Sequence, residues 1–225
     1  MELFSKYQSQ IFEAFWTTIQ LTVYSAIGAL ILGTLLAAFR LSPVPMLNWI
    51  GTAYVNVVRN TPLTLIILFC SFGLSQTLGI TLVDSKSLTS IEDSNFRLAV
   101  LGFTVYTAAF VCETVRSGVN TVPVGQAEAA RSLGLTFEQN LRIVLLPQAF
   151  RAVISPLGSV LIALTKNTTI ASAIGVAEAA LLMKEMIENE AALIYIGAAS
   201  VSYTHLTLPM GLFFGWLGKR LAVAR

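Results

Sequence analysis

One charged stretch separates two long apolar segments of this chain: Glu128-Ala129-Ala130-Arg131-Ser132-Leu133-Gly134, followed by Leu146-Pro147. Its pattern predicts two short helices joined by a turn. Gly134 stands where a helix end favours a left-handed backbone, and Thr136 with Gln139 has the spacing of a capping box. Pro147 then marks the entry into the next apolar segment. We therefore expect a compact polar element, displayed on one side of a membrane, on which another protein docks.

The composition points to a membrane protein. Of the 225 residues, 55% are hydrophobic and 12% are charged, against roughly 25% charged residues in ordinary soluble domains. The mean hydropathy is +0.74, so the bilayer is the expected solvent. The N-terminal residues lack the basic start and cleavage site of a secretory signal peptide, and the first apolar segment is expected to remain as a span. Cys70 and Cys112 fall in apolar runs without metal or disulfide spacing.

Five apolar segments approach the length of about 20 residues that a membrane-crossing helix needs. They predict an all-α integral membrane protein in which residues 1–225 form a single domain with five transmembrane helices. The expected spans cover residues 14–39, 61–83, 96–117, 151–177 and 191–217. Pro62, Pro156 and Pro209 fall within these segments and are expected to kink them.

The first span carries a small residue at every fourth position. Small residues at this spacing form one helix face and allow another helix to approach closely. The alternative is the general abundance of alanine and glycine in membrane helices, and the sequence does not decide between the two. The four positions are Ser25, Ala29, Gly33 and Ala37.

The distribution of charge predicts the orientation, because basic residues accumulate in cytoplasmic connections. Arginine and lysine follow the first span, fill the connection between the third and fourth spans, and recur at the C-terminus, whereas the other two connections are acidic. The N-terminus is therefore expected outside and the C-terminus inside. The basic residues are Arg40, Arg59, Arg116, Arg131, Arg142, Arg151, Lys219, Arg220 and Arg225, and the acidic ones are Asp84, Glu92, Asp93, Glu178, Glu185, Glu188 and Glu190.

The charged stretch resembles the signature loop of the permeases of binding-protein-dependent ABC importers, with Val144 in place of the usual isoleucine. The resemblance implies the type I (MetI-like) permease fold and a loop that docks in a groove of the ATP-hydrolysing subunit. It also implies two ATPase subunits, a second permease subunit that makes a heterodimer, an extracytoplasmic amino acid-binding protein, and a bacterial cell membrane. The implied ATPase contacts are Glu128, Ala129, Ala130, Gly134, Leu146 and Pro147.

Three further segments narrow the resemblance to polar amino acid permeases, and most closely to the glutamate permeases of actinobacteria. They are Arg59-Asn60-Thr61-Pro62-Leu63, Glu113-Thr114-Val115-Arg116-Ser117-Gly118 and Leu164-Thr165-Lys166-Asn167-Thr168-Thr169. The resemblance implies glutamate as the substrate. Another polar amino acid, such as glutamine, aspartate or a basic one, stays open.

Ionisable and polar groups at membrane depth are candidates for the substrate pathway, because they are costly there. Lys166 either lines the pathway or reaches the outer interface. Asn167 replaces an aspartate of the relatives and leaves positive potential beside Lys166, which favours an acidic substrate. Thr168 and Thr61 offer hydroxyl groups or bond back to their own helices. Arg116 either pairs with Glu113, three residues away, or contacts the substrate.

Other classes of function are poorly supported by the sequence. The chain has no phosphate-binding glycine loop, so it is not the ATPase, and no cofactor is expected. An ion-coupled secondary transporter would leave the charged stretch unexplained. A lone histidine, His205, gives neither a metal site nor a catalytic triad. Its surroundings, Val201-Ser202-Tyr203-Thr204-His205, also read as one frame of a transposon-derived sequencing adapter, so we assign no function to His205.

Overall fold

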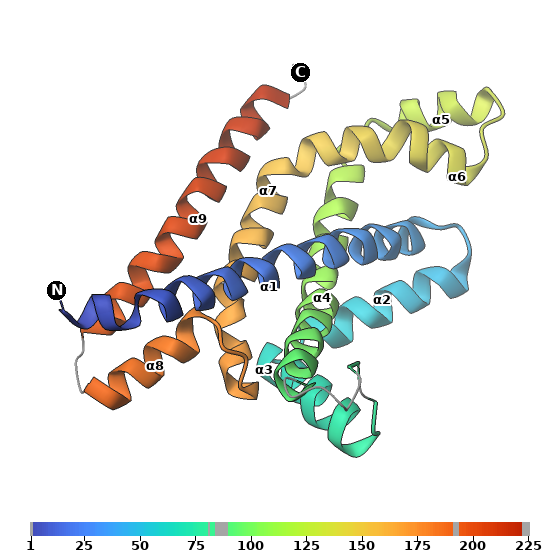
Figure 1. The fold of residues 1–225 in the computed structure, drawn as a ribbon. Coiled ribbons are helices and arrows are strands. Elements are labelled where there is room, and N and C mark those ends of the chain that lie inside the picture. The colour runs from blue at the N-terminus through green and yellow to red at the C-terminus, as the bar shows by residue number, and fades with distance from the viewer. Residues whose placement is uncertain (1, 81, 84–89, 191–193, 222–225) are drawn as a thin grey trace. The chain divides into compact units, whose positions relative to one another are not determined.

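The structure is a computed structural model, and it describes residues 2–80, 82–83, 90–190 and 194–221, with side chains for 6–80, 82–83, 91–189 and 203–221. The regular elements of these residues are all helical, as predicted (Figure 1). The α-helices are α1 (Glu2–Leu41), α2 (Pro45–Arg59), α3 (Leu63–Leu68), α4 (Ser90–Val119), α5 (Val124–Ser132), α6 (Phe137–Gln139), α7 (Leu146–Asn167), α8 (Ala179–Glu190) and α9 (Ile194–Leu221). Two π-helical segments, η1 (Phe69–Thr77) and η2 (Asn140–Leu145), and one 3₁₀ segment, η3 (Thr168–Ile174), complete the set.

Among the residues that the structure describes, three helical segments are by themselves long and apolar enough to cross a membrane: Lys6–Leu41, Ile91–Val119 and Phe137–Ile174. They contain the predicted first, third and fourth spans almost entirely. The predicted fifth span corresponds to α9, but residues 191–193 lie outside the described part of the chain. The same holds for Asp84, and the side chains of Glu190, Val201 and Ser202 are not described either. The count of five spans therefore stays a prediction.

The second predicted span differs in the structure. Residues 45–59, which the sequence analysis treats as a connection, form α2, and the helix after Pro62 ends at Thr77. The two helical segments Pro45–Arg59 and Leu63–Thr77 meet at an angle of 104°. Proline disfavours helical backbone at the residue before it, which explains the break at this point. Pro156 and Pro209, in contrast, lie inside continuous helices.

The chain divides into two compact units. Unit 1 comprises Met1–Ile27, Thr61–Thr104 and Ile162–Pro209, and unit 2 comprises Gly28–Asn60, Val105–Leu161 and Met210–Arg225.

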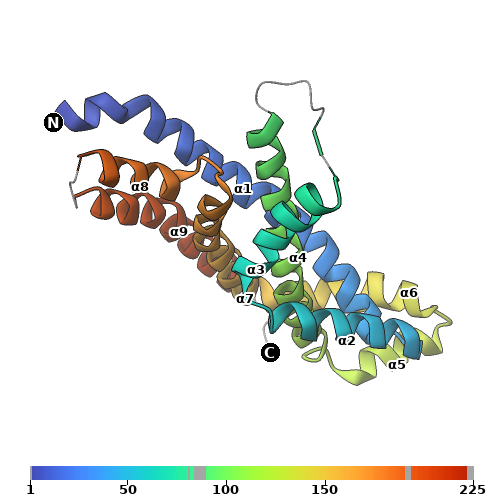
Figure 2. The same ribbon diagram turned by 90° about the horizontal axis from the view of Figure 1, so that it is seen from below.

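In unit 2, α2 folds back along the end of α1 (Figures 1 and 2). The small-residue face of α1 packs against α4: a Cβ atom on Gly33 would lie 2.6 Å from Cβ of Val111 and 2.8 Å from the carbonyl oxygen of Ala108. Ala29 and Ala37 on the same face are fully buried. The expectation of close helix approach is thus confirmed here, because any side chain larger than hydrogen at residue 33 would clash.

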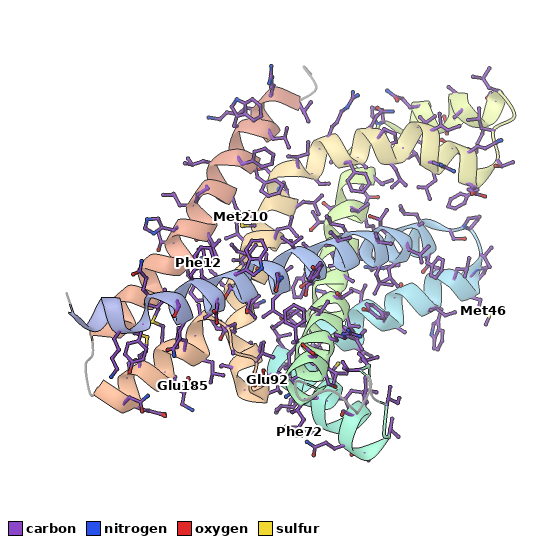
Figure 3. The ribbon with its side chains drawn as sticks, viewed as in Figure 1. Phe12, Met46, Phe72, Glu92, Glu185 and Met210 are labelled. Atoms are coloured by element: carbon purple, nitrogen blue, oxygen red, sulfur yellow. The ribbon has the colours of Figure 1, made fainter. Side chains whose placement is uncertain are left out.

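In unit 1, the first part of α1 makes polar contacts through short side chains. The Ser25 hydroxyl donates to the carbonyl oxygen of Val100 at 3.4 Å, and the Thr18 hydroxyl accepts from the backbone N–H of Ala179 at 3.2 Å. Large buried side chains fill the remaining space. They include Leu21, Ile67, Leu98, Phe103 and Leu164. The surface of unit 1 is itself apolar in places: Phe12, labelled in Figure 3, is 73% exposed.

Candidate functional site

The charged stretch forms a compact element in unit 2, made of α5, α6 and η2. Figure 1 shows α5 and α6 side by side. The Asn140 side-chain amide, which is buried, donates to the carbonyl oxygen of Ala127 at 3.1 Å and ties η2 to α5. Gln148 on α7 donates to the Gln126 side chain at 2.5 Å. These bonds cross-link the two arms of the element. We name α5, α6 and η2 together the coupling element.

The turn of the coupling element has the predicted local chemistry. Gly134 has a φ of +81°, in the left-handed region, where a side chain would be strained. The backbone N–H of Gln139 donates to the Thr136 hydroxyl at 3.3 Å, and the backbone N–H of Thr136 donates to the Gln139 side chain at 2.9 Å. The capping box is therefore confirmed, and it fixes the direction in which the chain leaves the turn.

The predicted docking residues are mostly accessible. Glu128, Ala129, Gly134 and Pro147 are exposed, and Leu146 is half-buried. Ala130 is buried, at 5% exposure, and its contribution to docking stays a prediction.

The surface of the coupling element also carries apolar side chains that the sequence analysis missed. Leu133, directly before the turn glycine, is 83% exposed. Val124, Ile143 and Phe137 are 69%, 64% and 41% exposed. The signal in the sequence is an apolar residue beside a C-terminal glycine in an otherwise polar loop. Exposed apolar groups beside charged ones are typical of a protein-docking surface.

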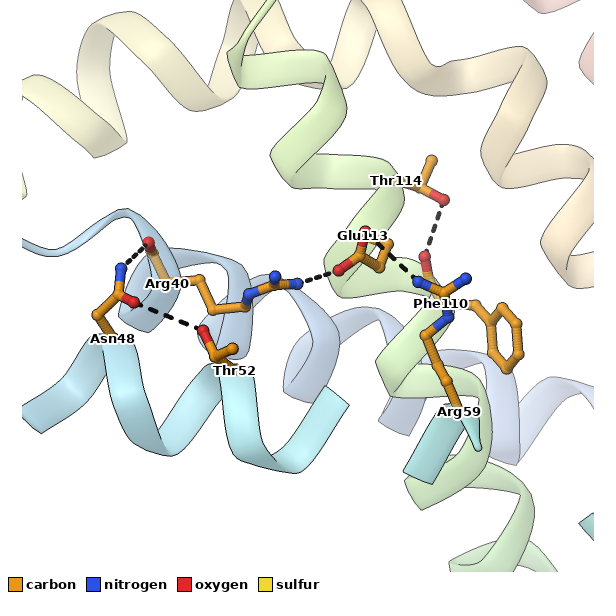
Figure 4. Close-up of polar contacts among 7 residues, drawn as sticks. All are labelled: Arg40, Asn48, Thr52, Arg59, Phe110, Glu113 and Thr114. Atoms are coloured by element: carbon orange, nitrogen blue, oxygen red, sulfur yellow. Dashed lines mark hydrogen bonds and ion pairs between the residues drawn. The ribbon is translucent and has the colours of Figure 1, made fainter. Parts of the chain in front are cut away.

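A cluster of charges joins three helices of unit 2 (Figure 4). The Glu113 carboxylate on α4 pairs with Arg40 at the end of α1 and, at 3.5 Å, with Arg59 at the end of α2. Asn48 donates to the carbonyl oxygen of Arg40 at 2.6 Å. The Arg59 guanidinium also lies 5.5 Å from the ring centre of Phe110.

This cluster corrects the predicted pair of Glu113 with Arg116. Among the described residues the carboxylate binds Arg40 and Arg59 instead, and its ion pairs do not include Arg116. The sequence offered a partner three residues away on the same helix, but tertiary packing brought two distant arginines closer. Sequence spacing alone gives no indication of such contacts between helices.

The substrate-pathway candidates Thr61, Lys166, Asn167 and Thr168 lie in unit 1. The Lys166 side chain is exposed, and Asn167 and Thr61 are half-buried. Thr168 is fully buried, and its hydroxyl donates to the carbonyl oxygen of Thr165 at 2.7 Å. For Thr168 the bond back to its own helix, the alternative weighed for threonine, is therefore what forms. The fifth candidate, Arg116, belongs to unit 2 and is half-buried.

Glu178 is a buried carboxyl group that the sequence analysis counted only as part of an acidic connection. Its side chain is fully buried in unit 1 and accepts hydrogen bonds from the backbone N–H groups of Ala180 at 2.8 Å and Leu181 at 3.0 Å. Burial raises the pKa of the Glu178 carboxyl above its usual value, against the opposing effect of these N–H donors. These two backbone contacts are those of a helix N-cap for α8, and the Tyr203 hydroxyl on α9 also donates to the carboxylate at 2.7 Å.

Long apolar helices together with an exposed coupling element define a subunit of a membrane transporter. The chain belongs to the family of binding-protein-dependent transport system inner membrane components, which it matches over residues 29–223. The proteins of this family are ABC importer permeases.

Named relatives and a solved structure agree with this membership. The chain is 63% identical to the glutamate transport system permease protein GluC of Corynebacterium efficiens and 61% identical to that of Corynebacterium glutamicum, over 214 residues and 94% of each chain. A crystal structure of an amino acid ABC transporter with histidines superposes with a TM-score of 0.81, at 25% identity, and covers 96% of both chains. The type I importer permease fold is thus confirmed.

Proposed function

We propose that this chain is a permease subunit of an ATP-driven glutamate importer in the bacterial cell membrane. The main support for glutamate as the substrate is the sequence identity of 61–63% to two glutamate transport system permeases along 94% of the chain. Asn167, which stands beside Lys166 where relatives have an aspartate, also supports an acidic substrate. Without that aspartate, the electrostatic potential around Lys166 stays positive where the substrate passes. Partner subunits hydrolyse the ATP, and this chain converts their movement into access for the substrate.

The coupling element is the proposed contact with the ATPase. Its exposed face presents Glu128, which offers a charge, and Leu133, which offers an apolar side chain. A Cβ atom on Gly134 would meet no other atom within 4 Å, so the turn leaves room for a partner to approach the backbone. The capping box and the Asn140 bond make the element stiff. A stiff element transmits a push from the ATPase to α7, whose first turn follows η2 directly.

The remaining partners follow from the same assignment. A second, different permease subunit encloses the pathway together with this one, two ATPases bind from the cytoplasm, and an extracytoplasmic binding protein delivers the amino acid. Lys166, Asn167, Thr168, Thr61 and Arg116 are the proposed contributions of this chain to the pathway. Thr168 acts there through the shape of η3, because its hydroxyl is already bonded.

Transport into proteoliposomes tests this function. The complete importer is reconstituted with ATP inside and the binding protein with labelled glutamate outside. Two variants separate docking from backbone strain: Gly134→Asn keeps a residue that tolerates the left-handed conformation, whereas Gly134→Val adds strain as well as bulk. The matched control is Gly215→Val, at a position where an added Cβ atom also meets nothing within 4 Å.

We expect ATP-dependent glutamate uptake by the unmodified importer and by Gly215→Val. Gly134→Asn should lower uptake strongly, and Gly134→Val further, while the ATPase subunits lose affinity for the membrane subunits. Uptake of a different amino acid would overturn the substrate and keep the mechanism. Full activity of both Gly134 variants would overturn the coupling role, and uptake driven by an ion gradient without ATP would overturn the proposal as a whole.

A further inference from the structure

The chain bends sharply between α2 and α3, directly after Arg59. The segments Pro45–Arg59 and Leu63–Thr77 are long and apolar enough for one membrane span only when taken together, and they meet at 104°. Interrupted helices are tolerated in a membrane where they are buried in protein or line a water-filled cavity, and in transporters such helices form substrate sites. As one broken span, this pair places Arg59 near its middle rather than in a connection.

Basic residues outnumber acidic ones in the helices around this bend. Residues 28–60 and 105–121, which belong to unit 2, hold three arginines, Arg40, Arg59 and Arg116, but a single acidic residue, Glu113. Three positive charges against one negative charge leave a surplus of two. Charges at membrane depth are costly without a partner, so this surplus requires an anion from outside these helices.

Arg59 is the arginine best placed to receive that anion. Arg40 is 10% exposed and holds one carboxylate oxygen of Glu113 in a hydrogen bond. Arg59 is 44% exposed, and its guanidinium lies 3.5 Å from the other oxygen, beyond the usual N–H···O distance of about 2.7–3.2 Å. Figure 4 shows Arg59 reaching from α2 to α4, beside the Phe110 ring. Its guanidinium therefore keeps N–H donors for a ligand, since it carries five.

The charge of these helices indicates which part of an amino acid binds here. A planar guanidinium matches a carboxylate in two parallel hydrogen bonds. The α-carboxylate of an amino acid comes with an ammonium group, which would need an acidic partner, and the Glu113 carboxylate is already shared by two arginines. A side-chain carboxylate lies farther from the ammonium group and gives glutamate its net negative charge. It is therefore the group that offsets the surplus.

We propose that Arg59 binds the side-chain carboxylate of the transported amino acid and so makes this subunit selective for an acidic substrate. Glu113 is a positioning residue, which holds Arg59 near α4 without using all its donors, and the Phe110 ring supports the guanidinium from one side. The inference rests on the proposed function and adds a contact that the pathway residues given above do not include.

Binding to the purified importer in lipid nanodiscs, without the binding protein, tests the proposal with labelled L-glutamate and L-glutamine as probes. Glutamine has nearly the same shape and no side-chain charge, so the comparison isolates the carboxylate. We expect glutamate to bind at least tenfold more tightly. Arg59→Gln should lower the affinity for glutamate about 10- to 100-fold, the equivalent of one charge-assisted hydrogen bond, and leave that for glutamine unchanged. Arg59→Lys should fall between, because it keeps the charge and loses the planar fork.

Arg220→Gln is the matched control. Arg220 is also an exposed arginine of unit 2, and its guanidinium lies 5.0 Å from the ring centre of Trp216, so its replacement removes the same charge and the same type of ring contact. Both affinities should stay unchanged in this variant. Thermal unfolding of the same samples separates a substrate contact from a structural role, because glutamate should stabilise the unmodified importer more than Arg59→Gln.

The proposal is overturned if glutamate does not bind to the unmodified importer, if glutamine binds as tightly, or if Arg59→Gln lowers both affinities equally. Loss of the second permease subunit from purified Arg59→Gln would likewise overturn it, because an acidic residue of that subunit would then be the anion. Selectivity lost in Arg59→Gln, together with uptake driven by an ion gradient, would keep this contact and overturn the proposed function. ATP-dependent glutamate uptake with unchanged selectivity in Arg59→Gln would do the reverse.

Discussion

At the scale of single residues, the Glu113 carboxylate shows how one partly buried charge joins three helices. Arg40 is 10% exposed at its side chain, so its charge depends on a partner within the protein. Arg59 is 44% exposed and has water and the Phe110 ring as alternatives. Removing one member of a buried ion pair is costly because it leaves the other charge uncompensated. The three residues are therefore unequal in importance.

Glu113→Gln is expected to destabilise the chain by about 1–3 kcal/mol, less than for a fully buried pair because the carboxylate is one-third exposed. The amide keeps the shape of the side chain and removes its charge, so Arg40 loses its counter-ion. Thermal unfolding of the detergent-solubilised importer measures the effect. Arg59→Gln serves as the comparison and should cost clearly less. Equal losses in the two variants would contradict the ranking by burial.

Asn167→Asp is the second prediction at this scale, and it concerns selectivity. An aspartate beside the exposed Lys166 would partly neutralise it and lower the positive potential. We expect uptake to shift from glutamate towards neutral or basic amino acids by about tenfold, the equivalent of about 1.4 kcal/mol. Competition between labelled glutamate and unlabelled amino acids in proteoliposomes measures the shift. Asn167→Gln, which adds length without charge, is the control. Unchanged selectivity in Asn167→Asp would remove the electrostatic argument for glutamate.

At the scale of helices, the small-residue face of α1 shows which sequence patterns carry tertiary information. Gly33→Val should destabilise the protein by about 1–3 kcal/mol, because its side chain would overlap Val111 and the backbone of Ala108. Thermal unfolding in detergent measures this change. Gly215→Val introduces the same side chain into α9, where an added Cβ atom meets no atom within 4 Å. If Gly33→Val and Gly215→Val lose similar amounts of stability, the cause is a general cost of valine in these helices rather than close packing at residue 33.

The helices also show which parts of the fold can be predicted from the sequence. The coupling element was predicted almost completely, since its capping box and its turn glycine depend on neighbouring residues only. The helical character of the long spans followed from hydrophobicity and length. In contrast, α2 was missed because residues 45–59 are too short for a membrane span. The sharp bend at Pro62 joins this helix to the next one, and a search for long apolar segments does not connect the two.

The residues of the candidate sites likewise fall into two groups: those predicted by the local sequence and those that depend on contacts between distant segments. Accessible positions such as Glu128 and Gly134 follow from the local pattern. The partners of Glu113 and the burial of Ala130 and Glu178 come from contacts between segments far apart in the chain. The periodicity of apolar and polar residues in the sequence does not predict such contacts. They are seen only in the folded structure.

At the scale of the whole molecule, the distribution of charge predicts the path of the chain through the membrane. Arg131 and Arg142 fall between the third and fourth predicted spans, Arg151 begins the fourth, and Lys219 with Arg220 follows the fifth. Basic connections stay in the cytoplasm, so these two regions should lie on the same side. Glu92 and Asp93, in the first turn of α4 and before the predicted third span, should lie on the opposite side.

Labelling of single introduced cysteines in cells tests this path, because the native Cys70 and Cys112 are 5% and 0% exposed and should not react. The exposed positions Glu92, Asn120 and Lys219 are suitable sites. A membrane-impermeant maleimide should label Glu92→Cys in intact cells, and Asn120→Cys and Lys219→Cys only after permeabilisation. Two spans are predicted between Asn120 and Lys219, so labelling of Lys219→Cys alone from outside would mean that α9 does not cross the membrane. Labelling of Asn120→Cys from outside would instead reverse the orientation and place the coupling element out of reach of a cytoplasmic ATPase.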